Sequence, residues 1–321
     1  MLTTVKNVAI QRIVNVEGDL SLDVKDFFDS ESQFKRVSAV TGIETVKNFS
    51  SESMLAPFLG LAERHFNNSR SKADVSAIVV VSQTRDHLLP NMSITLSQLI
   101  GLGTSVVCID LPFGCSGFGN GLYQAMLMAN NLKGRVLMFL GDRLSPFLGG
   151  DMTLLPVFSE AASLVEVAYV EAPYAETNFD IFSDGTGKND IIMTGSIYSD
   201  SKFQLKMNGT NVLNFAMIEV PKSVGRLVDN QGLAEADVDG VYLHQANRFV
   251  VDKITRRLPL PAKNNVYNDC RIGNTGPSTI PLLMEHIHGK GFISGNFITC
   301  GFGVGWSICS TYAFFDNVEI L

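Results

Sequence analysis

The sequence has few cysteines, and their arrangement matches neither a disulfide framework nor a metal site. Its 321 residues include five cysteines, scattered along the chain without any C-x-x-C pair. Paired spacings of that kind mark structural disulfides, redox-active dithiols and zinc sites. Their absence favours a reducing compartment, so we expect free thiols, no bound metal and a cytoplasmic location.

The chain also lacks the signals of membrane insertion, secretion and nucleic-acid binding. No apolar run approaches the roughly 20 residues that a bilayer-spanning helix requires. The N-terminal stretch MLTTVKNVAIQRIVNVEGD has a charge at Lys6 and no small-residue cleavage site, unlike a signal peptide. The net charge of −7 gives no sign of the basic face that binds phosphates. We therefore expect no membrane span and no nucleic-acid partner.

The sequence does contain a series of short apolar runs typical of an α/β fold. With 45% hydrophobic and 18% charged residues, the chain can bury a large core. Its β-branched runs alternate with stretches of helical spacing, which predicts parallel strands connected by helices. In the N-terminal part, strands are expected at 76–83, 105–111, 135–141 and 163–171, and helices at 91–103 and 116–134.

The same order of elements recurs in the C-terminal part. Helices are expected at 211–232, 247–258 and 276–291, and strands at 239–245, 264–269, 295–303 and 306–315. In each part, one strand leads through a glycine-containing elbow into an apolar helix. This repetition predicts two similar βαβαβ halves, residues 1–175 and 176–321. The stretch 172–190 is rich in turn residues, so we expect it to be a loop.

The elbow FGCSG places Cys115 directly before a predicted helix. A thiol at the first turn of a helix faces unpaired backbone N–H groups and the positive end of the helix dipole, which stabilise a thiolate. Gly114 and Gly117 permit a tight backbone at this point. The alternative role for a free cysteine is that of a small buried hydrophobe, which suits Cys108 and Cys309 within strands. We interpret Cys115 as a nucleophile.

Two polar residues stand at strand ends in the C-terminal half. His244 ends one apolar strand, and Asn274 lies at the matching point of the next unit. Ligands bind at this edge of open α/β sheets, so halves packed face to face would bring both residues to Cys115. Taken singly, His244 could be a structural histidine and Asn274 a turn residue or helix cap. Their equivalent positions favour a shared pocket.

Four separated segments resemble the signature blocks of the thiolase superfamily, in particular β-ketoacyl-acyl carrier protein synthase III and its relatives. They are DLPFGCSGFGNGL, HQAN, GNTGPSTIP and GFGVGWS, which occur here in that order. The resemblance covers nearly the whole chain. It implies a thiolase-like α/β fold in which the two halves pack as a five-layered αβαβα sandwich.

The resemblance also implies catalytic roles. Cys115 would attack an acyl thioester and carry the acyl group, while the backbone N–H groups of Cys115 and Val304 would form an oxyanion hole. His244 and Asn274 would hydrogen-bond the thioester carbonyl of a malonyl donor and stabilise the enolate that remains after loss of carbon dioxide. Because two neutral donors can serve an enolate oxygen, no metal or redox cofactor is expected.

Substrate-binding positions follow from the same resemblance. Asn247 and Gly209 would contact the pantetheine arm of the thioester. Just before a Thr-Gly-Ile element, the family has an aromatic residue and an arginine that hold the adenine of coenzyme A. Here Arg36 and Val40 stand where the aromatic residue and the arginine are expected, and Phe34 takes the aromatic position only with a shift. Phe34 and Arg36 are the residues that we assign to substrate binding in this stretch.

A basic cluster lies on and after the helix that follows the HQAN block. The family places basic residues on this helix, so the cluster is interpreted as a docking patch for acidic acyl carrier protein. A solvated helix face is the alternative. The cluster consists of Arg248, Lys253, Arg256 and Arg257.

The resulting prediction is a synthase III-like acyltransferase in fatty-acid, specialised-lipid or polyketide biosynthesis. Its substrates would be acyl-coenzyme A or acyl carrier protein, and the family leads us to expect a homodimer. An O- or N-acyltransferase on the same scaffold, with His244 as general base, is a second hypothesis. A non-catalytic partner subunit is a third, disfavoured because Cys115, His244 and Asn274 are all present.

Overall fold

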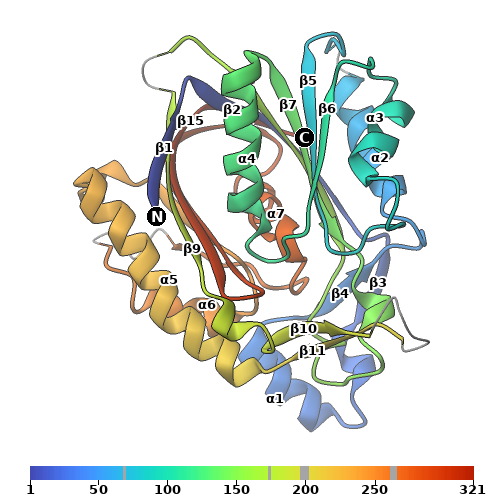
Figure 1. Ribbon diagram of the computed structural model, residues 1–321. Helices are drawn as coiled ribbons and strands as arrows, with labels where there is room; N and C mark the ends of the chain where they lie inside the picture. Colours follow the sequence, from blue (N-terminus) through green and yellow to red (C-terminus); the bar gives the residue numbers. More distant parts are fainter. Residues whose placement is uncertain (68–69, 173–174, 196–201, 261–265) are drawn as a thin grey trace.

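Two β-sheets face each other across a pair of helices, and further helices cover the outer face of each sheet (Figure 1). The computed structural model describes residues 1–67, 70–172, 175–195, 202–260 and 266–321. The fold is the five-layered, thiolase-like α/β sandwich expected from the sequence. At one corner the end of β15 pairs with β2, so the two sheets join edge to edge.

The first sheet has the strand order β2-β8-β7-β5-β6. Its parallel strands are near-continuous apolar runs because helices cover both of their faces. α2 and α3 lie on the outer face and α4 on the inner face (Figure 1). The strands are β2 (Val8–Glu17), β5 (Val75–Val81), β6 (Val107–Leu111), β7 (Arg135–Asp142) and β8 (Ala161–Tyr169). The helices are α2 (Leu55–Phe66), α3 (Met92–Ile100) and α4 (Gly117–Leu132).

The second sheet has the order β9-β15-β14-β12-β13, with β1 added beyond β9. α5 and α6 cover its outer face, and α7 lies on the inner face beside α4. The strands are β1 (Leu2–Lys6), β9 (Glu176–Ser183), β12 (Gly240–Leu243), β13 (Val266–Tyr267), β14 (Gly291–Gly303) and β15 (Ser307–Ile320). The helices are α5 (Gly209–Gln231), α6 (Arg248–Thr255) and α7 (Thr279–His288).

The two sheets repeat one topology. If the strands of each are numbered along the chain from β2 and from β9, both sheets have the order first, fifth, fourth, second, third. α4 and α7 are therefore equivalent helices, each entered from the third strand of its sheet. This equivalence places the starts of the two central helices, and the residues just before them, in matching positions.

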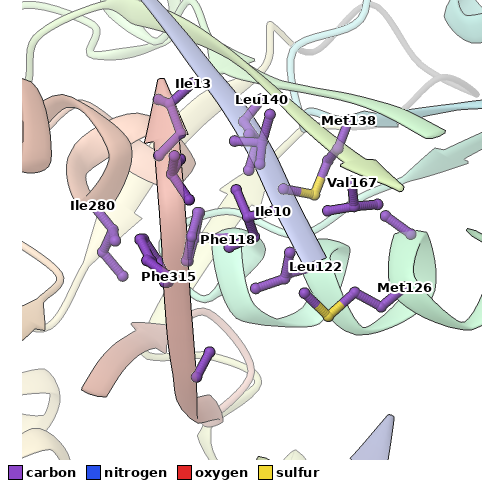
Figure 2. Close-up of a cluster of buried hydrophobic side chains, with 14 of the residues drawn as sticks. Ile10, Ile13, Phe118, Leu122, Met126, Met138, Leu140, Val167, Ile280 and Phe315 are labelled. Atoms are coloured by element: carbon purple, nitrogen blue, oxygen red, sulfur yellow. The ribbon is translucent and has the colours of Figure 1, made fainter. Parts of the chain in front are cut away.

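Hydrophobic packing follows the layers. One cluster of buried side chains lies between the sheets around α4 and α7, a second beneath α5 and α6, and a third beneath α2 and α3. Figure 2 shows part of the central cluster, where Phe118 and Leu122 of α4 lie among side chains from both sheets. Glycine lets α4 fit there: a Cβ at Gly119 would lie 2.7 Å from Cys309, and one at Gly121 would lie 2.7 Å from Val81.

Shorter elements are inserted between the repeated strands. Two of them, β10 and β11, form an antiparallel hairpin. The inserted strands and helix are β3 (Leu20–Asp23), α1 (Glu31–Thr41), β4 (Thr45–Asn48), β10 (Ile191–Thr194) and β11 (Gln204–Met207). The 3-10 turns are η1 (Val24–Phe27), η2 (Ser145–Phe147), η3 (Gly185–Gly187), η4 (Glu235–Asp237) and η6 (Gly276–Ser278).

The prediction of a loop at 172–190 is wrong, because β9 occupies much of this stretch and pairs with both β1 and β15. Its polar residues are typical of turns, but here they are buried with partners. Asn178 accepts a hydrogen bond from Thr4, and Asp180 accepts bonds from Ser223 and Arg226. Composition alone does not distinguish a turn from a strand whose polar groups are satisfied by neighbouring elements.

None of the helices in the described part of the chain is both long and apolar enough to cross a membrane.

Candidate active site

Cys115 lies at the bend between β6 and α4. The turn closes through a hydrogen bond of 2.7 Å from the Gly117 N–H to the Gly114 carbonyl. The end of β14 packs directly against it, since a Cβ at Gly303 would lie 2.9 Å from the Cys115 Cβ. A Cβ at Gly301 would lie 3.0 Å from the Cys115 carbonyl oxygen. The glycines of this strand end thus let the backbone of the second half approach the thiol.

Asn274 precedes α7 as Cys115 precedes α4. Its backbone is held by Val157, whose carbonyl accepts from the Asn274 N–H at 2.8 Å. Its side-chain Oδ1 accepts from the Gly276 N–H at 2.9 Å, which directs Nδ2 toward Cys115 Sγ, 3.9 Å away. The amide therefore presents a donor beside the thiol.

His244 directly follows β12 and is 1% exposed. Its Nδ1 lies 2.7 Å from Oγ1 of Thr279, on the first turn of α7. His244, Asn274 and Cys115 all line one cavity of about 360 Å³. The structure thus brings the three predicted residues to one pocket from the segments that follow β6, β12 and β13, while their catalytic roles remain predictions.

The electrostatics of the pocket differ from the expectation of a resting thiolate. Burial raises the pKa of the Cys115 thiol to about 12, and the neighbouring Asp142 carboxylate adds to this. The Asn274 amide and the backbone N–H of Cys115 lower this pKa but do not compensate for burial. Burial also lowers the pKa of His244 to about 3. At neutral pH the free site therefore holds a thiol beside a neutral imidazole, and the thiolate prediction is wrong.

Asp142 is a buried carboxylate in the same pocket, at the end of β7. Burial raises its pKa to about 6, although four donors act against this. Its Oδ1 accepts hydrogen bonds from Ser82, from the N–H of Gln83 and from both N–H and hydroxyl of Thr84. These bonds tie the segment that follows β5 to the end of β7, at the wall of the pocket.

The loop that contains Val304 is fixed to the base of α4. Ser307 donates to the Val304 carbonyl at 2.8 Å, and its hydroxyl lies 2.6 Å from that of Ser116. Val304 and Gly303 both line the pocket. This position is compatible with an oxyanion hole, which remains a prediction for the N–H groups of Val304 and Cys115.

Most of the remaining pocket wall is apolar. The hairpin β10–β11 and the segment that follows β7 supply much of it, together with the start of α5. These residues are Leu144, Val157, Phe158, Ile191, Met193, Leu205, Met207, Val212 and Leu213. The wall is suited to a hydrocarbon chain.

The predicted substrate-binding residues separate into two groups. Asn247 and Gly209 line the pocket, and a Cβ at Gly209 would meet no atom within 4 Å. Asn247 also caps α6, since its Oδ1 accepts from the Val250 N–H at 3.0 Å. Phe34 and Arg36 of α1 are not among the residues of the pocket wall. Phe34 instead packs on a small separate core beneath α1.

The predicted docking residues lie on and just after α6. Arg248, Arg256 and Arg257 are exposed, and Lys253 is half-buried. The helix begins at the pocket, because its cap Asn247 and its residue Val250 line the wall. The basic cluster is therefore next to the pocket, and docking remains a prediction.

Several pocket residues were not predicted from the sequence. Asp142 directly follows the strand predicted at 135–141, so the strand-end argument applied to His244 could have found it. In β11 the apolar residues Leu205 and Met207 alternate with polar ones, a period-two signal that could have identified this strand. Nothing in the sequence pattern marks Thr279 as the partner of His244.

Gly303 provides a direct test of the close approach to Cys115. In Gly303→Ala the new Cβ needs space that the Cys115 Cβ occupies, so the thiol must shift by a few tenths of an ångström. We expect the rate of Cys115 acylation to fall about tenfold or more, because misplacement of a reacting atom is costly. Intact-mass analysis of acylation reactions quenched at successive times measures this rate. Gly60→Ala, where a Cβ meets nothing within 4 Å, is the control, and equal rates in both variants would contradict the packing argument.

Comparison with known sequences identifies relatives along most of the chain. A family model described as 3-oxoacyl-[acyl-carrier-protein (ACP)] synthase III C terminal matches residues 228–313. A β-ketoacyl-[acyl-carrier-protein] synthase III of Synechocystis sp. is 30% identical over 249 residues, covering 72% of this chain and 74% of the relative. A protein of the same name from Geobacillus kaustophilus is 27% identical over 306 residues, covering 93% and 94%.

Solved structures share the fold. The 3-oxoacyl-(acyl-carrier protein) synthase from Burkholderia xenovorans LB400 has a TM-score of 0.89 at 23% identity, covering 100% of this chain and 99% of that one. The priming β-ketosynthase of the R1128 polyketide pathway has a TM-score of 0.86 at 21% identity, covering 98% and 97%. Together with the level of identity to the Synechocystis relative, these matches establish that the chain belongs to the β-ketoacyl-[acyl-carrier-protein] synthase III family.

Proposed function

We propose that this protein is a β-ketoacyl-acyl carrier protein synthase III. It would load an acyl group from a thioester onto Cys115 and then join it to a malonyl thioester by decarboxylative Claisen condensation. The observation that carries the proposal is the meeting of Cys115, His244 and Asn274 at one cavity of about 360 Å³ with an apolar wall. Family membership supports the same activity.

Loading begins from a thiol. A neutral thiol is a weak nucleophile, so the attack needs a base. As Sγ of Cys115 attacks the thioester carbon, Nε2 of His244 would accept the S–H proton. The N–H groups of Cys115 and Val304 would stabilise the oxyanion. The acyl chain would then lie against the hairpin β10–β11, with its carbonyl at Cys115.

Condensation uses the same pocket with different donors. The Asn274 Nδ2–H and the His244 Nε2–H would donate to the thioester oxygen of the malonyl group. These donors stabilise the enolate that forms as carbon dioxide leaves, and its carbon attacks the acyl-Cys115 carbonyl. This chemistry requires no metal or redox cofactor, because the charge develops on an oxygen that two neutral donors can hold.

We further propose that the basic cluster on and just after α6 binds the acyl carrier protein. In the double variant Arg256→Glu/Arg257→Glu, attraction to an acidic partner becomes repulsion, so kcat/KM for malonyl-carrier protein should fall about tenfold or more at low salt. The loss should shrink as ionic strength rises. Steady-state kinetics at several salt concentrations measure both effects.

The matched control reverses the charges of two lysines that lie far from the pocket. Lys133 follows the last turn of α4 and Lys290 precedes β14, so both lie away from the elbows that form the site. Lys133→Glu/Lys290→Glu makes the same change in net charge. If kcat/KM for malonyl-carrier protein falls equally in both double variants, the loss comes from overall charge and the docking patch is rejected.

A homodimer is part of the proposal. β6 is an edge strand, and its Val107 is 42% exposed; Leu99 and Ile94 of the adjacent α3 are 48% and 52% exposed. An apolar edge of this kind favours pairing with a second copy of the chain. The five free cysteines support a cytoplasmic location, since reducing compartments maintain thiols.

Intact-mass analysis with and without malonyl-carrier protein tests the activity. Incubation with acyl-coenzyme A or acyl-carrier protein should add one acyl group to the chain. Addition of malonyl-carrier protein should remove that group and yield a 3-ketoacyl product. An acyl adduct that persists with malonyl substrate but transfers to an alcohol or amine would replace the proposal with O- or N-acyl transfer. No adduct from any thioester would reject both activities.

A further inference from the structure

The two half-reactions place opposite demands on Nε2 of His244. During loading this atom must lack a proton, so that it can accept one from Cys115. During condensation it must carry a proton to donate to the thioester oxygen. A neutral imidazole has one N–H, so the two steps need different tautomers. Because burial lowers the pKa of His244 to about 3, a doubly protonated ring cannot persist through both steps. The tautomer is set by the group that contacts Nδ1.

That group is the hydroxyl of Thr279, which can serve either tautomer. It lies 2.7 Å from Nδ1, and it also donates to the Gly276 carbonyl at 3.1 Å. When the hydroxyl proton points to Gly276, Oγ1 accepts from Nδ1–H and leaves Nε2 free to accept. When the hydroxyl proton points to Nδ1, the ring proton sits on Nε2. In the change between these states, Oγ1 accepts the Nδ1 proton while the hydroxyl proton turns away from the Gly276 carbonyl and passes to an acceptor on the other side of Thr279, and the reverse change returns both.

A small polar cavity lies on that other side. Its volume of about 10 Å³ is close to what a single water needs. Thr275 lines it and is 2% exposed, and its Oγ1 has no hydrogen-bond partner in the part of the chain that the structure describes. Gln245, Asp269, His286 and Thr279 also line it. A buried hydroxyl without a partner, facing a water-sized polar space, indicates a bound water.

Charged side chains lie between this small cavity and the protein surface. His286 lies 2.9 Å from Oε1 of Glu17 and 3.4 Å from Oδ2 of Asp269, and its side chain is 19% exposed. These two carboxylates raise the pKa of His286 to about 9. Lys47 faces Glu17 and Arg271 faces Asp269, so each carboxylate beside this imidazole also has a basic partner. Protons can therefore be exchanged with bulk water at this side of the molecule.

We propose that the cavity binds one water, and that this water and the Thr279 hydroxyl form a proton relay that switches the tautomer of His244 between the half-reactions. The inference rests on the proposed function and adds a positioning residue to it. The relay reaches His244 from the side of Thr279 that faces away from the substrate pocket. Bound substrate therefore does not block it.

The proton count closes over one turnover. In loading, Nε2 takes the proton of Cys115, and Nδ1 releases its proton through Thr279 and the water to solvent. The departing thiolate of the donor takes a proton from solvent. In condensation, the S–C bond to Cys115 breaks, the sulfur takes the Nε2 proton, and Nδ1 regains one through the relay. The net uptake is one proton, which matches the carboxylate lost as carbon dioxide.

Thr279→Val removes the hydroxyl while nearly keeping the volume. A buried Nδ1–H facing a methyl group would be an unsatisfied donor, so the ring proton should remain on Nε2. We expect Cys115 acylation to fall about 100-fold, the usual loss for a missing general base, and malonyl decarboxylation to fall less than about tenfold. Thr279→Ser keeps the hydroxyl and should recover acylation. Single-turnover mass analysis and carbon dioxide release measure the two steps separately.

Long-range proton–nitrogen NMR spectra of the imidazoles give a readout independent of activity. Wild-type free protein should show His244 protonated at Nδ1, and Thr279→Val should show it protonated at Nε2. The His244→Gln spectrum identifies the signal. The same tautomer in both proteins, or equal losses in both half-reactions, would overturn the relay. If the wild type accepts no acyl group, the proposed function fails, and the spectra still show whether Thr279 sets the tautomer.

Discussion

Replacing Cys115 with alanine is expected to abolish covalent acylation, with a loss of at least about 10⁴-fold in condensation. Cys115 is the only thiol on the pocket wall in the described part of the chain, and no hydroxyl side chain lines that wall. Removal of a nucleophile has losses of this order in other enzymes. The fold should persist, since alanine retains the Cβ that packs against β14 and loses only long contacts of about 4 Å between Sγ and the Asn274 amide. Intact mass after incubation with acyl thioester measures the adduct, and thermal unfolding measures the fold.

Cys108→Ala is the matched control. Cys108 is the one other cysteine that is not fully buried, and it lies on β6, the strand that leads to the elbow. Its variant should acylate at the wild-type rate. Acylation that survives in Cys115→Ala, or is lost in Cys108→Ala, would overturn the assignment of the nucleophile.

Replacing Asn274 with alanine is expected to separate the two half-reactions. Acylation of Cys115 should remain within about tenfold of the wild type, because the proposed oxyanion hole does not use this side chain. Malonyl decarboxylation should fall about 10²- to 10³-fold, as when one donor is removed from a preorganised oxyanion site. Release of carbon dioxide from malonyl-carrier protein measures the second step.

Asn274→Asp distinguishes the donor from the local structure. Asn274 Oδ1 also accepts from the Gly276 N–H, so alanine removes a structural hydrogen bond that contributes about 1 kcal/mol. Aspartate retains that acceptor but presents an anion in place of the Nδ2–H donor. Both variants should lose decarboxylation, whereas decarboxylation retained in Asn274→Asp would show that the donor has no role.

The convergence of the site could be predicted because it depends on the repeated topology. Cys115 and Asn274 each precede a central helix of the same type, and His244 ends the strand between, so residues far apart in sequence share one sheet edge. These positions are marked by glycine elbows and apolar runs, which are strong local signals.

The charge state of the site could not be predicted in this way. Helix-dipole reasoning treats Cys115 as if solvent surrounded it, whereas the assembled fold buries the thiol close to the Asp142 carboxylate. Burial depends on how the two halves meet, which is a tertiary property. The strand β9 was missed for a similar reason, because partners from other elements satisfy its polar residues.

The reacting residues and the apolar wall of the pocket come from different parts of the fold, and this has a consequence for evolution. The reacting side chains come from the elements that both sheets share, but Ile191, Met193, Leu205 and Met207 come from a hairpin inserted between β9 and α5. Sequence drift in that hairpin can alter which acyl chain is accepted without moving a reacting atom. Exchanging this hairpin among relatives is thus a route to altered chain-length selectivity on an unchanged catalytic frame.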